Sequence, residues 1–188
     1  MRYHINAIPA KLEVLLMQMP ELLTPRLILR PTQESDGPTC LSIWLDDEMG
    51  RYLADPPRDK ASEAYLNFAV GIENDEDWYP MVAINRETGM FIGTCSVVPT
   101  EDGVCWDLGY CIHRDYWKQG YATELVSRLI DEGKYRGVKA FTAAVAQENA
   151  ASNALCRKLG FRVWKDDAAF RKSGTEIVYP EFIYRLEV

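Results

Sequence analysis

Residues 108–124 read Leu-Gly-Tyr-Cys-Ile-His-Arg-Asp-Tyr-Trp-Lys-Gln-Gly-Tyr-Ala-Thr-Glu, and this stretch decides the fold. Its first part belongs to a predicted strand over 104–113, in which the internal Gly109 indicates a bulge or a close backbone approach. From Gly120 onward the spacing becomes helical, with apolar residues at Ala122, Leu125, Val126, Leu129 and Ile130. The stretch therefore predicts a strand, a polar loop and an amphipathic helix in succession.

The start of this helix has the properties of an anion site. The first N–H groups of a helix lack intrahelical acceptors and lie at the positive end of its dipole. Gly120 and the small Ala122 leave room for a phosphate, and Lys118 adds positive charge. The segment is neither a Walker loop nor a GxGxxG fingerprint. By itself it is equally compatible with a plain strand–loop–helix connection.

The rest of the chain contains strands and helices in a readable order. Alternation predicts a strand over 26–30, and an N-cap candidate at Ser35 or Asp36 predicts a helix to about Leu45. Helical spacing predicts a second helix after Pro56 and Pro57. Further predicted strands are 78–86, 90–98, 138–146, 161–165 and 181–188, with a helix over 149–159. This order predicts one α/β (α+β) domain with a mixed, largely antiparallel sheet.

A second informative segment is 147–161, Gln-Glu-Asn-Ala-Ala-Ser-Asn-Ala-Leu-Cys-Arg-Lys-Leu-Gly-Phe. Asn149, Ser152, Asn153 and Cys156 fall at i, i+3, i+4 and i+7, so small hydrogen-bonding groups share one helical face directly after a buried strand. Asn149 by itself is equally compatible with a simple N-cap.

Together the two segments resemble the GNAT superfamily of N-acetyltransferases. The family's pyrophosphate loop, Arg/Gln-x-x-Gly-x-Gly/Ala, is matched at Gly120-Tyr-Ala122, while Trp117 occupies its first position. This departure, and the stretch 24–31, are similar to the branch that contains the ribosomal-protein N-terminal acetyltransferases. The second signature, Asn-x-x-Ser with a Leu-Gly-Phe ending, is matched by Asn149, Ser152 and 159–161. The resemblance covers 24–188 as one domain and leaves 1–23 as a predicted helical extension.

The resemblance implies a sheet with flanking helices and a splayed strand pair that holds acetyl-CoA. The pantetheine arm would pair with backbone near Cys111, Ile112 and His113, and Asn149 would hydrogen-bond it. A backbone N–H near Tyr110 or Cys111 would polarise the thioester carbonyl. The predicted pyrophosphate contacts are backbone amides of Lys118, Gln119, Gly120, Tyr121, Ala122 and Thr123.

The implied reaction is direct attack of a neutral amine on the thioester, so a base must first remove a proton. In the family an acidic residue on the bulged strand does this, and Asp107 occupies that place, with a relay water expected because Asp is short. A strand-end Asp in a turn or salt bridge is the alternative, and His113 is a weaker candidate base. Positioning alone also contributes to the rate.

The tyrosine that many relatives use as general acid is replaced by Cys156. Ser152 would then hydrogen-bond the leaving thiolate, unless the thiolate leaves without a proton donor. Cys156 also suggests an acyl-cysteine intermediate, for which no His or Asn partner is adjacent in sequence; a small core cysteine is the commoner case.

Composition restricts the partners. The net charge is −7 with no dense Lys/Arg cluster, so we expect no nucleic-acid partner. Acidic runs at 46–48 and 73–77 either attract a cationic amine or form a solvated surface. Five cysteines without a CxxC pair and only two histidines argue against disulfides and a metal site, and fit a reducing cytoplasm. The apolar run 12–19 is too short to span a bilayer.

The sequence thus predicts an N-acetyltransferase that moves acetyl from acetyl-CoA to a protein N-terminus, a polyamine-like metabolite or an antibiotic amine. The alternative is a catalytically inactive CoA-binding sensor or interaction module. Acceptor specificity is expected from segments 45–59 and 168–179, with Arg51, Tyr52, Asp55 and Trp78 as pocket candidates. The apolar extension is compatible with a homodimer.

Overall fold

The computed structural model describes residues 19–70, 78–101 and 103–188. Within these residues one sheet holds eight strands in the order β1-β2-β3-β4-β5-β6-β8-β7. The strands are β1 Leu22–Leu23, β2 Leu27–Pro31, β3 Tyr79–Asn85, β4 Phe91–Thr100, β5 Cys105–Ile112, β6 Ala140–Ala146, β7 Arg162–Arg171 and β8 Val178–Glu187. Neighbouring strands are antiparallel except β5 and β6, which are parallel. The predicted mixed, largely antiparallel sheet is confirmed.

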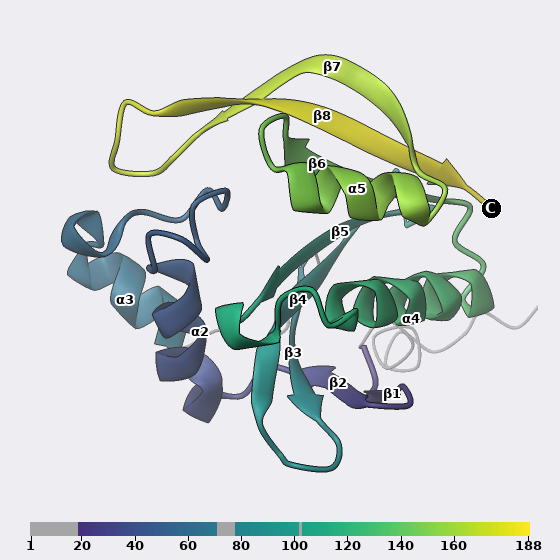
Figure 1. Cartoon of the computed structure of the whole chain (residues 1–188), viewed down its shortest axis with the longest axis horizontal. Helices are drawn as coiled ribbons and strands as arrows, with labels where there is room; N and C mark the ends of the chain where they lie inside the picture. The colour runs from purple at the N-terminus through teal and green to yellow at the C-terminus, as the bar shows by residue number, and fades with distance from the viewer. Residues whose placement is uncertain (1–18, 71–77, 102) are drawn as a thin grey trace, which may run out of the picture.

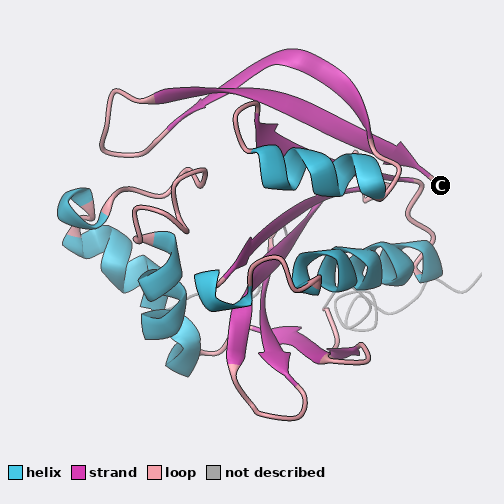
Figure 2. Ribbon diagram, viewed as in Figure 1, coloured by secondary structure: helices cyan, strands magenta, loops and turns pink. Residues whose placement is uncertain are grey.

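Helices lie on both sides of this sheet (Figures 1 and 2). The α-helices are α2 Gly37–Trp44, α3 Glu63–Val70, α4 Tyr121–Tyr135 and α5 Ala150–Lys158, and the 3-10 turns are η1 Glu34–Asp36, η2 Arg58–Lys60 and η3 Arg114–Tyr116. Apart from β1, the described elements follow the predicted order, since apolar spacing marks most of them locally.

The main core lies between the sheet and α4. Leu125 and Leu129 of α4 are fully buried and belong to one cluster with Leu108 of β5 and Phe141 of β6. Side chains alternate along β4, so Thr94 and Ser96 lie on the opposite face from the core residue Cys95. On that opposite face Trp44 Nε1 of α2 donates to Thr94 Oγ1 at 3.1 Å. The sheet thus separates an α4/α5 side from an α2/α3 side.

Two local expectations need correction. Leu22 and Leu23, predicted to end a helical extension, form β1 because they pair with Leu29 and Ile28 of β2. The remainder of that extension, residues 1–18, lies outside the described residues, so the domain division stays a prediction. β7 and β8 are each longer than predicted, since they pair with each other along most of a long hairpin.

The structure decides between the two alternatives predicted for Gly109. The register between β4 and β5 runs without a shift from Gly93↔Ile112 to Thr100↔Cys105, so no bulge opposes β4 at Gly109. A Cβ at Gly109 would instead lie 2.8 Å from Ser96 Oγ. Close approach across the sheet is therefore the reason for glycine at this position.

Within the described part of the chain, no helix combines the length and hydropathy needed to span a bilayer.

Candidate active site

The parallel strands β5 and β6 separate in the middle of the sheet. They pair with each other over Cys105–Asp107 and Ala140–Thr142. Beyond these residues β5 continues to Ile112 and β6 to Ala146, and the two strands no longer pair with each other. At the last pair, Thr142 Oγ1 donates to Asp107 Oδ1 at 2.6 Å. Burial raises the pKa of Glu181 on β8, and the charge of Asp107 raises it further, so the two carboxylates interact. Asp107 therefore lies where the strands diverge, the predicted splay.

The loop between η3 and α4 is bent by two residues in the left-handed region. Lys118 has φ 59° and Gly120, the N-cap of α4, has φ 83°. A Cβ at Gly120 would meet nothing closer than Arg26 Nη2 at 3.5 Å, so this glycine is required by its backbone angle and not by crowding. The loop leads directly into the helix start, whose first N–H groups have no intrahelical acceptor.

Arg26, which directly precedes β2, and Glu124, in the first turn of α4, fix this loop. Arg26 Nη1 donates to Gln119 O at 3.0 Å, Arg26 Nε donates to Glu124 Oε2 at 2.7 Å, and the guanidinium lies 4.1 Å from the Tyr121 ring centroid. Glu124 Oε1 also accepts from Thr24 Oγ1 at 2.6 Å. Burial opposes ionisation of Glu124, but the bonds from Thr24 and Arg26 outweigh it and lower its pKa. The helix start is thus held by residues nearly one hundred positions away in the sequence.

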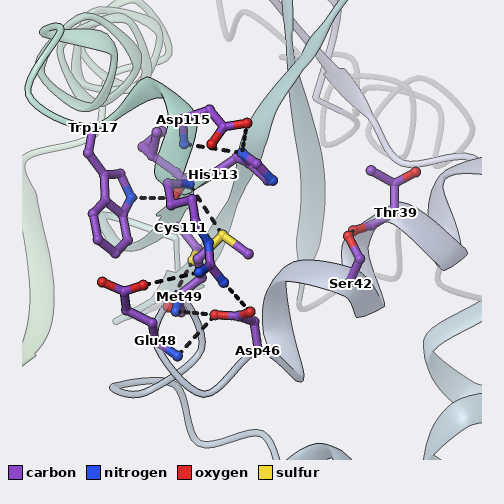
Figure 3. A network of polar contacts seen from close by, with 11 residues as sticks. Thr39, Ser42, Asp46, Glu48, Met49, Cys111, His113, Asp115 and Trp117 are labelled. Atoms are coloured by element: carbon purple, nitrogen blue, oxygen red, sulfur yellow. Dashed lines mark hydrogen bonds and ion pairs between the residues drawn. The ribbon is translucent and has the colours of Figure 1, made fainter.

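Trp117, the departure from the family loop, has a structural role at the end of β5. Its Nε1 donates to Ile112 O at 2.6 Å, which joins the loop to the strand (Figure 3). His113 Nδ1 accepts from Asp115 N at 3.3 Å, so the imidazole caps η3.

The acidic run 46–48 contacts the same strand end. The carboxylates of Asp46 and Glu48 pair with the guanidinium of Arg114, and Cys111 Sγ lies 3.3 Å from Met49 O (Figure 3). The run is therefore ion-paired rather than merely solvated. The second acidic run, 73–77, lies outside the described residues.

The backbone direction of β5 distinguishes the predicted pantetheine contacts. His113 N donates to Ile92 O of β4, and Lys139 N on the β6 side donates to Val104 O. Since amide directions alternate along a strand, the N–H groups of Cys111 and His113 point to β4, and those of Tyr110 and Ile112 point to the gap. Tyr110 N–H is accordingly the better placed of the two predicted oxyanion donors.

The loop before α5 is organised by two asparagines. Asn149 Oδ1 accepts from Ser152 N at 3.2 Å, so Asn149 is the N-cap of α5. Asn153 is buried; its Nδ2 donates to Ala146 O at 3.0 Å and its Oδ1 accepts from Tyr184 OH at 2.8 Å. Asn153 thus holds the helix to β6 and β8, while Asn149 Nδ2 donates to no other described residue.

The Tyr110 phenol and the Ser152 hydroxyl lie near Cys156, the position that the family tyrosine would occupy. Burial raises the pKa of the Tyr110 phenol, and a hydrogen bond with Ser152 partly opposes that shift. Cys156 is 4% exposed, and burial raises its pKa to about 11, with partial opposition from Arg157. This environment favours a packed thiol over a reactive thiolate at Cys156.

A cavity of about 170 Å³ opens on the α2/α3 side of β5. Two of the predicted pocket residues, Asp55 and Trp78, line it. The other two lie elsewhere: Arg51 pairs with Glu148 at 3.5 Å, and Tyr52 contacts the Tyr179 ring edge-on at 5.6 Å between centroids.

The β7–β8 hairpin reaches the loop that forms one wall of this cavity (Figure 1). Lys172 is buried, and its Nζ donates to Gly50 O at 2.9 Å and to Leu53 O at 3.2 Å. Ser173 N donates to Ala54 O at 2.9 Å. Burial lowers the pKa of Lys172, against the charges of Asp55 and Asp47. The predicted segments 45–59 and 168–179 are therefore brought together, although most of the second segment is strand and hairpin turn.

Comparison with known proteins shows the family of this chain. A family model described as an acetyltransferase (GNAT) domain matches residues 26–162, more than half of the chain. The chain belongs to the GNAT acetyltransferase family. The predicted resemblance is confirmed, and GNAT acetyltransferases use acetyl-CoA as the acetyl donor.

Individual relatives are distant in sequence. A protein of Bacillus licheniformis named uncharacterized N-acetyltransferase p20 is 29% identical over 77% of this chain and 83% of its own length. A spermidine N-acetyltransferase from Vibrio cholerae, solved with CoA and spermine, superposes with TM-score 0.70 at 16% identity over 87% of this chain and 96% of that chain. An acetyltransferase from Salmonella typhimurium that modifies the N-terminal serine of ribosomal protein L7/L12 has TM-score 0.68 at 16% identity, over 88% and 96%.

Sequence patterns did not indicate several residues of this candidate site. Thr142, Glu181 and Lys172 come from separate strands and a turn, and no spacing relates them to Asp107 or to the loop after α2. Tyr110 was visible in the motif, but its contact with Ser152 depends on how α5 packs. Among the described residues, no group of three or more His, Cys, Asp and Glu side chains is placed to hold a metal ion.

Proposed function

We propose that this protein is an N-acetyltransferase that transfers the acetyl group of acetyl-CoA to a primary amine. One observation carries the proposal: β5 and β6 diverge after Asp107 and Thr142, and the diverging β5 leads through the left-handed Gly120 into the start of α4. Such a helix start binds phosphate, and the adjacent gap exposes strand backbone for a pantetheine arm. The complex of a structural neighbour with CoA and spermine supports an amine acceptor.

The residues present fit acetyl-CoA. Backbone amides from Lys118 to Thr123 would bind the pyrophosphate. The Tyr121 side chain would not take part, because it is buried and its hydroxyl accepts from Asn85 Nδ2 at 3.2 Å. Asn149 Nδ2 would donate to the pantetheine while Oδ1 keeps the cap of α5. Tyr110 and Ile112 would supply the gap-facing backbone groups in place of Cys111 and His113.

The proposed reaction is direct. The amine nitrogen forms a bond to the thioester carbon, whose oxygen accepts a hydrogen bond from Tyr110 N–H. The carbon–sulfur bond then breaks, and the thiolate leaves next to the Ser152 hydroxyl, from which it accepts a hydrogen bond before it takes a proton from solvent. The nitrogen loses its proton to Asp107 through a water, and Thr142 holds the acceptor carboxylate in position.

The first experiment is calorimetric titration with acetyl-CoA, with NADH and ATP as comparison ligands, followed by an amine panel. Acetyl-CoA should bind selectively, and Asp107→Asn should lower kcat about 100-fold with unchanged acetyl-CoA affinity. Asp131→Asn, on the exposed side of α4, is the matched control. Absence of acetyl-CoA binding by folded protein would refute the proposal, and binding without transfer to any amine would establish the inactive CoA-binding alternative.

A further inference from the structure

The cavity beside β5 has a definite chemical character. Its lining includes the aromatic residues Trp44, Tyr65 and Trp78 from three separate segments, together with Pro80 and Leu53. Asp55 is the one residue with a formal charge at neutral pH among the described residues that line it. An apolar, aromatic cavity with a single carboxylate suits a cation attached to an apolar body.

Asp55 has an acceptor left for a ligand. Its Oδ1 accepts from Tyr65 OH at 2.7 Å, which orients the carboxylate, and its Oδ2 accepts from no described residue. Lys172 lies near enough to interact electrostatically, but its ammonium donates to Gly50 O and Leu53 O. A ligand ammonium can therefore hydrogen-bond Oδ2 without displacing an existing contact.

The cavity reaches the strand on which the reaction is proposed to occur. Gly109 and Cys111 line it, and the lack of a side chain at Gly109 opens the cavity onto β5 backbone next to Tyr110 N–H. Asp55 lines the same cavity as Gly109 and Cys111 of this strand. An amine paired with Asp55 is thus held beside the proposed thioester position.

The wall that carries Asp55 is fixed at both sides. Met49 O contacts Cys111 Sγ on β5, and Lys172 and Ser173 of the hairpin bond the carbonyls of Gly50, Leu53 and Ala54. The position of this wall is therefore set by the folded chain. Its volume, about 170 Å³, is close to that of an apolar cavity of about 150 Å³ that binds benzene.

From these observations we propose that the acceptor is a small primary monoamine whose body is about the size of a benzene ring. It binds as an ammonium paired with Asp55, loses one proton to Asp107 through the relay water, and attacks the thioester as the neutral amine. The inference rests on the proposed function and specifies its substrate class. A polyamine needs several anionic partners, and the described residues of the lining offer one, Asp55. A protein N-terminus would bring several amide groups against a lining whose uncharged hydroxyl groups, besides the Tyr65 and Tyr110 phenols, are those of Thr94 and Ser96, so most of these amides would lack partners.

The test is steady-state kinetics of the full-length protein with acetyl-CoA and three acceptors: benzylamine, spermidine and a short peptide with N-terminal serine. We expect kcat/KM for benzylamine at least tenfold above both others. Asp55→Asn should lower it about 100-fold, with the KM for acetyl-CoA unchanged. Asp59→Asn is the matched control, because this carboxylate lies four residues away in the same loop and is 75% exposed.

A size series on the wild-type protein needs no variant and tests the same inference. Activity should rise from methylamine to benzylamine and fall at 1-naphthylmethylamine. A higher kcat/KM with spermidine or the peptide, an unbroken rise with size, or equal effects of the two Asp variants would each overturn the inference and leave the proposed function standing. Failure to bind acetyl-CoA, or to acetylate any amine, would overturn both.

Discussion

Alanine substitutions at Gly120 and Gly137 allow the effect of backbone strain to be measured separately from the effect on ligand binding at the start of α4. Gly120 and Gly137 have nearly the same angle, φ 83° and 87°, and lie at opposite ends of this helix. Alanine in this region costs about 1–2 kcal/mol, offset by roughly 0.4–1 kcal/mol from the less flexible unfolded chain. A Cβ at Gly137 meets nothing within 4 Å, and at Gly120 it makes one ordinary contact at 3.5 Å. Both variants should therefore lose about 1 kcal/mol of stability.

Acetyl-CoA affinity should distinguish the two variants. A methyl group at Gly120 stands where a phosphate would approach the loop amides, and loss of one charge-assisted hydrogen bond is worth about 1.5–3 kcal/mol. Gly120→Ala should weaken acetyl-CoA binding at least tenfold, which corresponds to about 1.4 kcal/mol, while Gly137→Ala should bind as the wild type does.

The assay combines thermal unfolding with calorimetric titration of acetyl-CoA. Both variants should lower Tm by about 2–4 °C, as 1 kcal/mol does in a domain of this size. Equal acetyl-CoA affinity in the two variants would show that the phosphates do not approach Gly120. A much larger loss of stability in Gly120→Ala would refute the assumption that the two positions carry similar strain.

Two further predictions concern the residues around this site. Asn149→Asp keeps an Oδ1 acceptor for Ser152 N and removes the Nδ2 donor. It should therefore leave Tm unchanged and raise the KM for acetyl-CoA about tenfold. Equal KM values in the variant and the wild type would show that Asn149 acts only as the N-cap of α5. Glu124→Gln should lower the free energy of unfolding by about 2 kcal/mol near neutral pH, because Thr24 and Arg26 lose a charged acceptor. Since the folded-state pKa of Glu124 is below its ordinary 4.5, this stabilisation is present above the unfolded-state pKa and is lost as pH falls toward the folded-state value. Urea unfolding of both proteins should show the difference shrinking below about pH 5, and a constant difference would contradict this account.

Local patterns predicted the elements that carry the site. The helical spacing from Ala122 to Ile130 and the alternation in 26–30 are set within a few residues, so α4 and β2 were predictable. The β7–β8 hairpin was predicted too short, because β7 is exposed along most of its length and lacks an apolar alternation to mark it. Leu22 and Leu23 carry an apolar pair compatible with either element, and pairing with β2 decides for a strand.

The sequence by itself determined the family of this protein, through the order and spacing of 108–124 and 147–161, and with it the fold and the position of Gly120, Asn149 and Asp107. The tertiary structure alone decided which side chains meet: Arg26 with Glu124, Thr142 with Asp107, Lys172 with the loop at Gly50, and Asp55 with Tyr65 over Gly109. The physical reason is that backbone preferences and apolar periodicity act over a few residues, whereas most of these contacts join segments brought together only when the sheet closes its core.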